Sequence, residues 1–371
     1  MPTILDVLFC VLIATVIVQS LYFIFIFGKF PSSNTKAINN EQPKVSVIIC
    51  AKNEARNLSR FLPSILSQQY TDFEIVLIND GSSDDTLRTM EHFEKGDKRI
   101  KIVNVKSVDA FWGNKKYALT LGIKAASSDT LLFTDADCKP VSDQWISKMC
   151  SPLSAGKNIV LGYSPYRKIK GSFLNRLIRF ETFMTALQYF SYAQIGLPYM
   201  AVGRNFAYNK KLFFEANGFI KHIRIKSGDD DLFVNQVANS KNTSYCIEPD
   251  SFVESIPETN LKNFLRQKRR HVSTSRFYKL KHKIILGFFY LSQILFWLSA
   301  ITLLSTLYLW NLVVVAILFR FVLQFYIFNK VAKKLGEIDL LYALPMTEFV
   351  LIMTQFYIFM HNLISKPKHW K

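Results

Sequence analysis

The chain has 371 residues, half of them hydrophobic, and a formal net charge of +18. In a soluble protein this charge would suggest nucleic-acid binding, but here the apolar residues gather at the two ends of the chain and lysines follow them, as at Lys29, Lys36 and Lys44. Basic residues beside apolar spans are typical of the membrane side that carries anionic lipid, so we expect a membrane partner and no nucleic acid. The five cysteines lack zinc-type spacing and indicate reduced thiols, not a disulfide framework.

The first apolar stretch covers residues 4–27 and carries no charge after Asp6. About 20 apolar residues are enough to cross a bilayer. The alternative, a cleaved signal peptide, would begin with basic residues and end at a small-residue cleavage site, and this stretch does neither. We therefore predict a retained transmembrane anchor over residues 1–28, followed by a polar linker over residues 29–43.

From residue 44 to residue 137, apolar runs rich in β-branched residues alternate with stretches of helical periodicity. The runs "KVSVIICAKNE", "FEIVLIND", "RIKIVNV" and "TLLFTDAD" predict strands buried on both faces, and "ARNLSRFLPSILSQ", "DDTLRTMEHFEK" and "NKKYALTLGIKAA" predict the helices between them. In the second of these helices, Asp84 and Asp85 are expected in the first turn. This alternation is typical of a parallel sheet with helices on both faces. Ligands of such sheets bind at the carboxyl ends of the strands, where several polar residues fall: Asn53, Glu54, Asn79, Asp80, Asp135 and Asp137.

After Pro140 the pattern loosens. Residues 166–200 combine basic and aromatic residues and predict helices at the membrane interface. Residues 284–328 predict a hairpin of two spanning helices with a break near residue 310, and 347–364 is a third apolar segment. If that third segment crossed outward, its basic end would lie on the wrong side, so a re-entrant or interfacial segment is the alternative. Within the hairpin, Arg320 could pair with a lipid phosphate or with Glu348, or it could snorkel to the interface.

Six motifs follow one another along the chain: "VSVIICAKNEARNL", "VLINDGSSDDT", "GNKKYAL", "LLFTDADC", "GDDDL" and "QKRRH". Together they make the chain resemble a membrane-bound family 2 glycosyltransferase. The resemblance implies an α/β GT-A fold, a Rossmann-like and mostly parallel sheet, as the catalytic domain over residues 44–275. A C-terminal membrane region over residues 276–371 would then hold two or three hydrophobic segments.

The resemblance also implies a nucleotide-sugar site. Departure of the diphosphate needs a divalent cation, Mg²⁺ or Mn²⁺, which proteins bind through a few carboxylates together with phosphate oxygens. In "DAD", Asp137 would hold the metal and Asp135 would face the ribose. The remaining nucleotide-sugar residues would be Asp80, Ala51, Asn53 and Glu54 around the base, Lys115 at the nucleotide, and Gln267 with Arg270 at the diphosphate. The family has Trp where this chain has His271.

Three adjacent acids, Asp229, Asp230 and Asp231, precede an amphipathic stretch. Crowding of carboxylates raises a pKa and suits a general base. Counting back from Leu232 by the family pattern selects Asp229, but Gly228 stands where an acid often precedes it, so Asp230 is a second candidate. Arg204 and Asn205 match the acceptor side of the family's site.

The sequence thus predicts an inverting transfer of a sugar from a UDP- or GDP-linked donor to a lipid or lipid-linked hydroxyl. The chain would be an integral membrane protein with its catalytic domain on the cytoplasmic face, as in a bacterial inner membrane. The alternatives are a processive polysaccharide synthase of the same family, a catalytically inactive membrane scaffold and a membrane-bound nucleic-acid binder.

Overall fold

The structure is a computed structural model that describes residues 2–32, 42–106, 115–225 and 227–365. The chain divides into two compact units. Of the described residues, those within 42–170 and 196–259 form the sheet unit, and those within 2–32, 171–195 and 260–365 form the membrane unit. Most of the predicted linker and nearly all of the basic C-terminal end lie outside the described residues.

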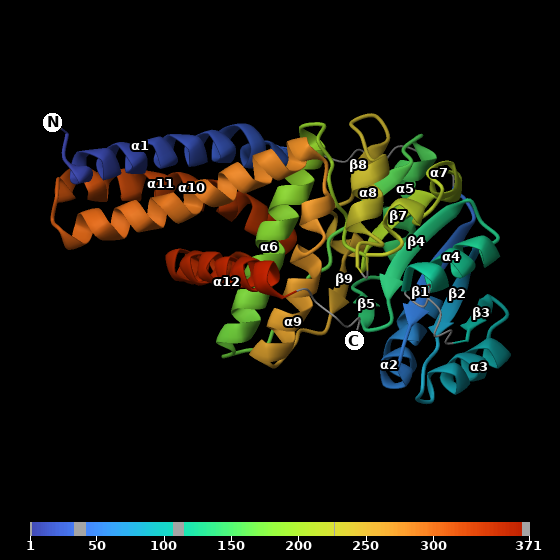
Figure 1. The fold of residues 1–371 in the computed structure, drawn as a ribbon. Coiled ribbons are helices and arrows are strands. Elements are labelled where there is room, and N and C mark those ends of the chain that lie inside the picture. Colours follow the sequence, from blue (N-terminus) through green and yellow to red (C-terminus); the bar gives the residue numbers. More distant parts are fainter. Residues whose placement is uncertain (1, 33–41, 107–114, 226, 366–371) are drawn as a thin grey trace. The chain divides into compact units, whose positions relative to one another are not determined.

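The sheet unit is built on a seven-stranded sheet in the order β3-β2-β1-β4-β7-β6-β8 (Figure 1). The first four strands are parallel, β7 runs antiparallel between β4 and β6, and β5 pairs with β9 in a small second sheet. The strands are β1 (Val45–Ala51), β2 (Phe73–Asp80), β3 (Ile100–Val105), β4 (Thr130–Asp135), β5 (Cys138–Pro140), β6 (Ile159–Leu161), β7 (Phe206–Asn209), β8 (Thr243–Tyr245) and β9 (Val253–Ser255). The predicted GT-A architecture with a mostly parallel sheet is confirmed.

Helices cover both faces of this sheet because its central strands are apolar on both sides. In β2, Ile75 and Leu77 join the core formed with α2, α3 and α5, whereas Ile78 faces α4. A side chain at Gly122 of α4 would lie 2.1 Å from the Ile78 side chain, so glycine permits this close packing. The helices of the unit are α2 (Ala55–Leu66), α3 (Thr86–Gly96), α4 (Lys115–Ala125), α5 (Trp145–Ser154), α7 (Lys210–Glu215) and α8 (Asp231–Val237).

The predicted strands and helices up to residue 137 are confirmed, with one local correction. Asp84 and Asp85 precede α3 and do not lie in its first turn. Asp85 is the N-cap residue, and the Asp84 carboxylate accepts a hydrogen bond from the Thr86 amide at 3.0 Å. A carboxylate in this position satisfies an amide that the helix itself leaves unpaired.

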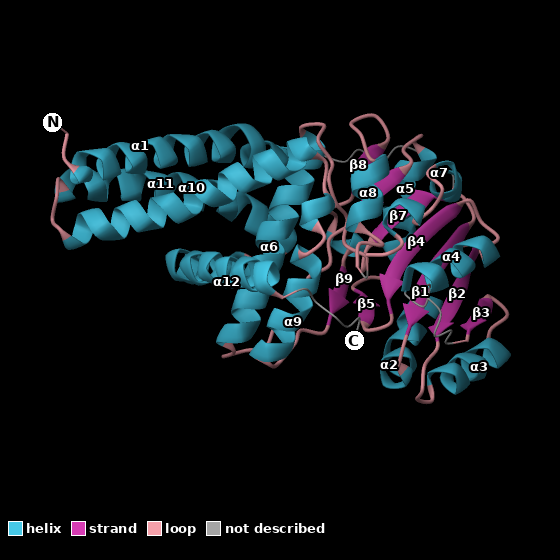
Figure 2. Ribbon diagram, viewed as in Figure 1, coloured by secondary structure: helices cyan, strands magenta, loops and turns pink. Residues whose placement is uncertain are grey.

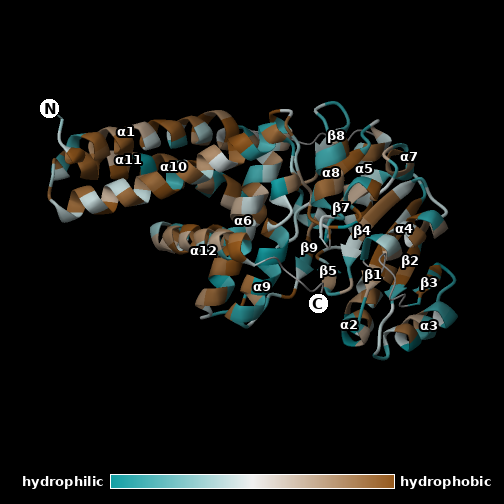
Figure 3. Ribbon diagram, in the orientation of Figure 1, coloured by the Kyte–Doolittle hydropathy of each residue, from teal (hydrophilic) through white to brown (hydrophobic). Residues whose placement is uncertain are grey.

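The described part of the membrane unit is helical, without strands (Figure 2). Within the described residues, four helical segments are long and apolar enough to cross a membrane, one N-terminal and three C-terminal, and their residues are predominantly hydrophobic in Figure 3. They indicate a membrane protein. The turn between the second and third begins at Thr306 and includes Leu307 and Leu309 with positive φ, close to the predicted break. The four candidate spans are Ile4–Phe30, Leu280–Ser305, Trp310–Leu335 and Ile338–Ile364.

Six α-helices form the described part of the unit, and three of them, α1, α10 and α11, contact one another along the bundle (Figure 1). α6 and the basic helix α9 belong to the same unit. The helices are α1 (Ile4–Leu21), α6 (Phe173–Gln194), α9 (Leu261–Val272), α10 (Leu280–Ser305), α11 (Trp310–Leu335) and α12 (Leu344–Ile364).

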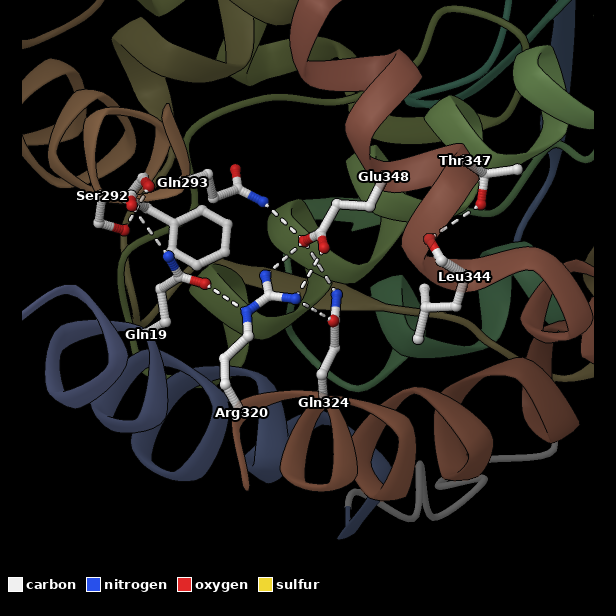
Figure 4. A network of polar contacts seen from close by, with 9 residues as sticks. Gln19, Ser292, Gln293, Arg320, Gln324, Leu344, Thr347 and Glu348 are labelled. Carbon is white, nitrogen blue, oxygen red and sulfur yellow. Dashed lines mark hydrogen bonds and ion pairs between the residues drawn. The ribbon is translucent and has the colours of Figure 1, made fainter. Parts of the chain in front are cut away.

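A buried polar network joins all four candidate spans (Figure 4). Arg320 of α11 is fully buried and binds Glu348 of α12 through two nitrogens, at 2.6 and 2.7 Å. Its Nε donates to Gln19 of α1 at 2.8 Å, and Gln293 of α10 donates to Glu348 at 3.1 Å. Of the alternatives for Arg320, the structure selects the pair with Glu348.

The ends of α12 contact different levels of the membrane unit. Near its start, Glu348 reaches the middle of α10 and α11 through Gln293 and Arg320. Near its end, the Asn362 amide donates to the backbone carbonyl of Arg269 in α9 at 3.0 Å. α12 therefore runs from the middle of the bundle to α9.

Candidate active site

The carboxyl ends of β1 and β2 are tied together by side chains. Asn53, which has a positive φ of 57°, accepts hydrogen bonds from the Ser83 amide at 2.8 Å and the Ser83 hydroxyl at 3.3 Å. The turn after β2 is closed by Asn79, whose side chain accepts from the Ser82 amide at 3.2 Å. Because Asn79 and Asp84 supply the turn and the cap, the Asp80 carboxylate is not needed for either. Burial raises the pKa of Asp80, and lysines oppose this shift.

Lys115 lies at the centre of the site, at the start of α4. Its ammonium is 3.1 Å from Asp135 Oδ1 and 3.2 Å from Asp229 Oδ2. Burial opposes its charge, yet the two carboxylates hold the pKa of Lys115 well above its usual value. The structure therefore brings together three of the predicted site residues, one from each of three separate chain segments.

Asp137 lies two residues past Asp135, and its surroundings disfavour the ionised carboxylate. Burial, followed by repulsion from Asp135 and Glu54, raises the pKa of Asp137 to about 6. Arg204 partly offsets this shift. The Arg204 guanidinium stacks on Tyr166, with its carbon 4.3 Å from the ring centroid, and its Nη1 has no hydrogen-bond partner among the described residues. Negative charge and an unused donor thus lie in one place.

The three acids at the start of α8, Asp229, Asp230 and Asp231, have different surroundings. Burial would raise the pKa of Asp229, but Lys115, a backbone hydrogen bond and Lys116 together outweigh burial, and the pKa lies below its ordinary value. Burial and the two neighbouring acids raise the pKa of Asp230 to about 7. Asp230 accepts hydrogen bonds from the Gly203 amide at 2.6 Å and the Asp231 amide at 2.7 Å, so both its oxygens hold backbone in place. Asp229 is the acid whose carboxylate pairs with Lys115.

A small cavity of about 10 Å³ adjoins this cluster. Lys115, Asp229 and two hydroxyl-bearing residues, Thr134 and Tyr208, are among the residues that line it. Both hydroxyl oxygens are buried without a hydrogen-bond partner among the described residues. The site therefore contains several polar atoms that the folded chain does not satisfy.

One sequence-based expectation is wrong. Asn205 is fully buried, and its amide nitrogen donates to the carbonyls of Tyr163 at 2.7 Å and Ser251 at 2.8 Å, while its oxygen accepts from Trp145 Nε1 at 3.0 Å. These bonds occupy the amide internally, so Asn205 supports the fold and does not meet substrate.

Other predicted residues keep their assignments as predictions. Ala51 ends β1 and Glu54 is the N-cap residue of α2, both at the same edge of the sheet. Gln267 and Arg270 lie three residues apart on α9 of the membrane unit. Cys138 is buried within the hydrophobic core, as expected of a packing residue.

The described residues contain no cluster of three His, Cys, Asp or Glu side chains arranged to hold a metal ion. Asp135 and Asp137 are separated by one residue, and their repulsion contributes to the raised pKa of Asp137. Such a pair fits a Mg²⁺ or Mn²⁺ ion that takes most of its ligands from substrate phosphates and water.

Comparison with known proteins identifies the family to which the sheet unit is related. Residues 46–217 match the profile described as glycosyl transferase family 2. The chain carries a family 2 glycosyltransferase domain. An uncharacterized glycosyltransferase of Haemophilus influenzae is 34% identical over 149 residues, which are 40% of this chain and 42% of that protein. The 4,4'-diaponeurosporenoate glycosyltransferase of Staphylococcus aureus is 27% identical over 146 residues, 39% of this chain and 38% of the relative.

A third relative of the family 2 domain is the poly-beta-1,6-N-acetyl-D-glucosamine synthase of Staphylococcus epidermidis, 35% identical over 33% of this chain and 29% of the synthase. The matches thus span less than half the length of these relatives. Among solved structures, a mannosyltransferase from Pyrobaculum calidifontis in complex with GDP-Man and Mn²⁺ has a TM-score of 0.58 at 14% identity, covering 91% of this chain and 99% of that one. This likeness shows a shared fold.

Proposed function

We propose that the chain is an inverting glycosyltransferase that moves a sugar from a UDP- or GDP-linked donor to a hydroxyl of a lipid or lipid-linked acceptor. The observation that carries the proposal is the position of Lys115 between Asp135 and Asp229 at the strand ends of a family 2 domain. One carboxylate of this cluster can face the donor while the other faces the acceptor.

In the proposed reaction, Asp229 accepts the proton of the acceptor hydroxyl. The hydroxyl oxygen forms a bond to the anomeric carbon as the bond from that carbon to the diphosphate oxygen breaks, which inverts the anomeric centre. The lowered pKa of Asp229 keeps the carboxylate ionised before the reaction. Asp230 stays the second candidate for the base, although its oxygens hold backbone amides.

On the donor side, Asp80 with Ala51, Asn53 and Glu54 would bind the base and Asp135 the ribose, while Gln267 and Arg270 would bind the diphosphate. Asp137 would hold Mg²⁺ or Mn²⁺, whose charge neutralises the departing diphosphate. The Mn²⁺ and GDP-Man bound by the Pyrobaculum calidifontis mannosyltransferase support such a donor and ion.

The four candidate spans support a lipid or lipid-linked acceptor, because they hold the catalytic chain at a bilayer. We place the catalytic domain on the cytoplasmic face, where nucleotide sugars are made. The relative named for 4,4'-diaponeurosporenoate favours a lipid acceptor, whereas the poly-beta-1,6-N-acetyl-D-glucosamine synthase favours the processive alternative.

The test is release of UDP or GDP from a panel of nucleotide sugars by the purified full chain, with Mn²⁺ and membrane lipid extract. We expect lipid-dependent turnover that Asp137→Ala abolishes. Asp72→Ala, which removes an exposed acid just before β2, is the matched control. No turnover with any donor, together with unchanged nucleotide binding in Asp137→Ala, would contradict the proposal.

A further inference from the structure

Lys116, the residue after Lys115, is a buried lysine on α4 with an unusual set of partners. It is 2% exposed, and its ammonium donates to three backbone carbonyls, those of His222 at 2.8 Å, Ile225 at 2.8 Å and Ser227 at 2.7 Å. An ammonium has three donors, and here all three serve one loop. That loop leads directly through Gly228 to Asp229.

The position of the loop matters because Asp229 must face its partners accurately. Gly228 has a φ of +90°, and a side chain there would lie 2.6 Å from Leu232, so the chain turns sharply into the acidic segment. Lys115 then binds the Asp229 carboxylate at 3.2 Å. Two consecutive lysines of α4 therefore bind the same loop. Lys116 binds its backbone carbonyls, and Lys115 binds the Asp229 carboxylate at its end.

The charge of Lys116 serves the same segment. Burial lowers the pKa of Lys116 to about 8, although nearby Asp229, Asp231 and Asp230 oppose this shift. In return Lys116 helps to lower the pKa of Asp229. The groups that face Asp229 electrostatically are Lys115, Lys116, Asp230, Cys50, Tyr208 and His222.

We propose that Lys116 is a positioning residue for Asp229: its ammonium binds the carbonyls of His222, Ile225 and Ser227 and so fixes the carboxylate that takes the acceptor proton. This inference rests on the proposed function. It gives the second lysine of "NKKYAL" a role in the chemical step, whereas the first belongs to the nucleotide site.

The test compares Lys116→Met, which removes every donor, with Lys116→Gln, whose amide keeps two donors without the charge. Lys124→Met, an exposed lysine of the same helix, is the matched control. We expect Lys116→Met to lower kcat about 100-fold while donor affinity changes less than threefold, because a small misplacement of a reacting group is enough for this loss. Lys116→Gln should retain most of kcat, and its acid limb in the pH profile should move to higher pH, because the positive charge near Asp229 is gone.

Two outcomes overturn the inference. One is wild-type kcat in folded Lys116→Met. The other is a loss of kcat that only follows the loss of folded protein in the melting curve. If Lys116→Met does not fold, Lys116→Gln decides: an unmoved acid limb overturns the inference. Asp229→Asn separates the two proposals, because full activity in that variant removes the base assignment itself, whereas an inactive Asp229→Asn beside a fully active Lys116→Met removes only the role of Lys116.

Discussion

Each unit of the molecule buries a charged cluster, and the two clusters differ in how well they are satisfied. In the membrane unit, Arg320 and Glu348 balance in charge, and glutamines fill the remaining hydrogen bonds. In the sheet unit, burial and neighbouring acids raise the pKa of Asp137 and of Asp230, and Arg204 Nη1 and the Tyr208 hydroxyl lack partners among the described residues. We call the Arg320–Glu348 cluster closed because its polar atoms bind one another, and such a network holds helices together. We call the Lys115 cluster open because some polar atoms beside it have no partner among the described residues, and a ligand could bind these atoms.

The largest change in kcat is expected for a variant of the proposed general base in the open cluster. Asp229→Asn should lower kcat by about 10²–10⁴-fold, the usual contribution of a general base, and leave donor affinity nearly unchanged. Asp230→Asn should instead lower the melting temperature, because Asp230 caps α8 and binds the Gly203 amide. Steady-state kinetics and melting curves of both variants give the answer. If Asp230→Asn loses kcat and Asp229→Asn only lowers the melting temperature, the base is Asp230.

Disrupting the closed cluster should lower the free energy of unfolding without altering the candidate active site. Arg320→Met leaves Glu348 buried without its partner, which typically destabilises a protein by about 3–5 kcal/mol. The double variant Arg320→Met with Glu348→Leu removes both charges and should recover most of that loss. Thermal unfolding in detergent measures the difference. Equal stability of the single and double variants would show that the pair is not coupled.

Metal binding at the open cluster should depend on pH, whereas the Arg320–Glu348 pair is proposed to bind no metal. In the proposed site a cation would bind the ionised Asp137 carboxylate, and burial with repulsion from Asp135 and Glu54 raises the pKa of that group to about 6. Protons therefore compete below that pH, and Mn²⁺ affinity should fall roughly tenfold for each further unit of acidification. Titration with Mn²⁺ between pH 5 and pH 8 tests this. Asp72→Ala should follow the wild-type curve, and a flat curve for the wild type would exclude Asp137 as the ligand.

The smallest effect is expected at the Tyr208 hydroxyl. Since this hydroxyl has no hydrogen-bond partner among the residues that the structure describes, Tyr208→Phe should change the free energy of unfolding by less than about 1 kcal/mol. Gln324→Leu in the closed network should destabilise the chain more, because Gln324 binds both Arg320 and Glu348. Melting curves of the two variants compare them directly. A larger loss in Tyr208→Phe would mean that this hydroxyl is satisfied in solution.

The first half of the sheet was predictable because its strands are continuous apolar runs and its helices keep a regular period. The antiparallel β7 was not, because "FAYN" is short and its partners β4 and β6 are set by tertiary packing. The motifs identified Asp135, Asp229 and Lys115, which the structure brings together. Lys116 was missed because nothing in the local sequence distinguishes a lysine that binds three distant carbonyls from a solvated one. Asn205 was misassigned because its partners come from three other segments.

The direction of α12 has a consequence for how many times the chain crosses the bilayer. α10 begins shortly after α9, and Ser365, the last described residue, accepts a hydrogen bond from Arg269 of α9 at 2.7 Å. The chain thus enters α10 and leaves α12 at the same end of the helical bundle. Because α12 also starts beside the middle of α10 and α11, its course favours the re-entrant alternative for the third apolar segment, in which the three C-terminal helices would make two crossings.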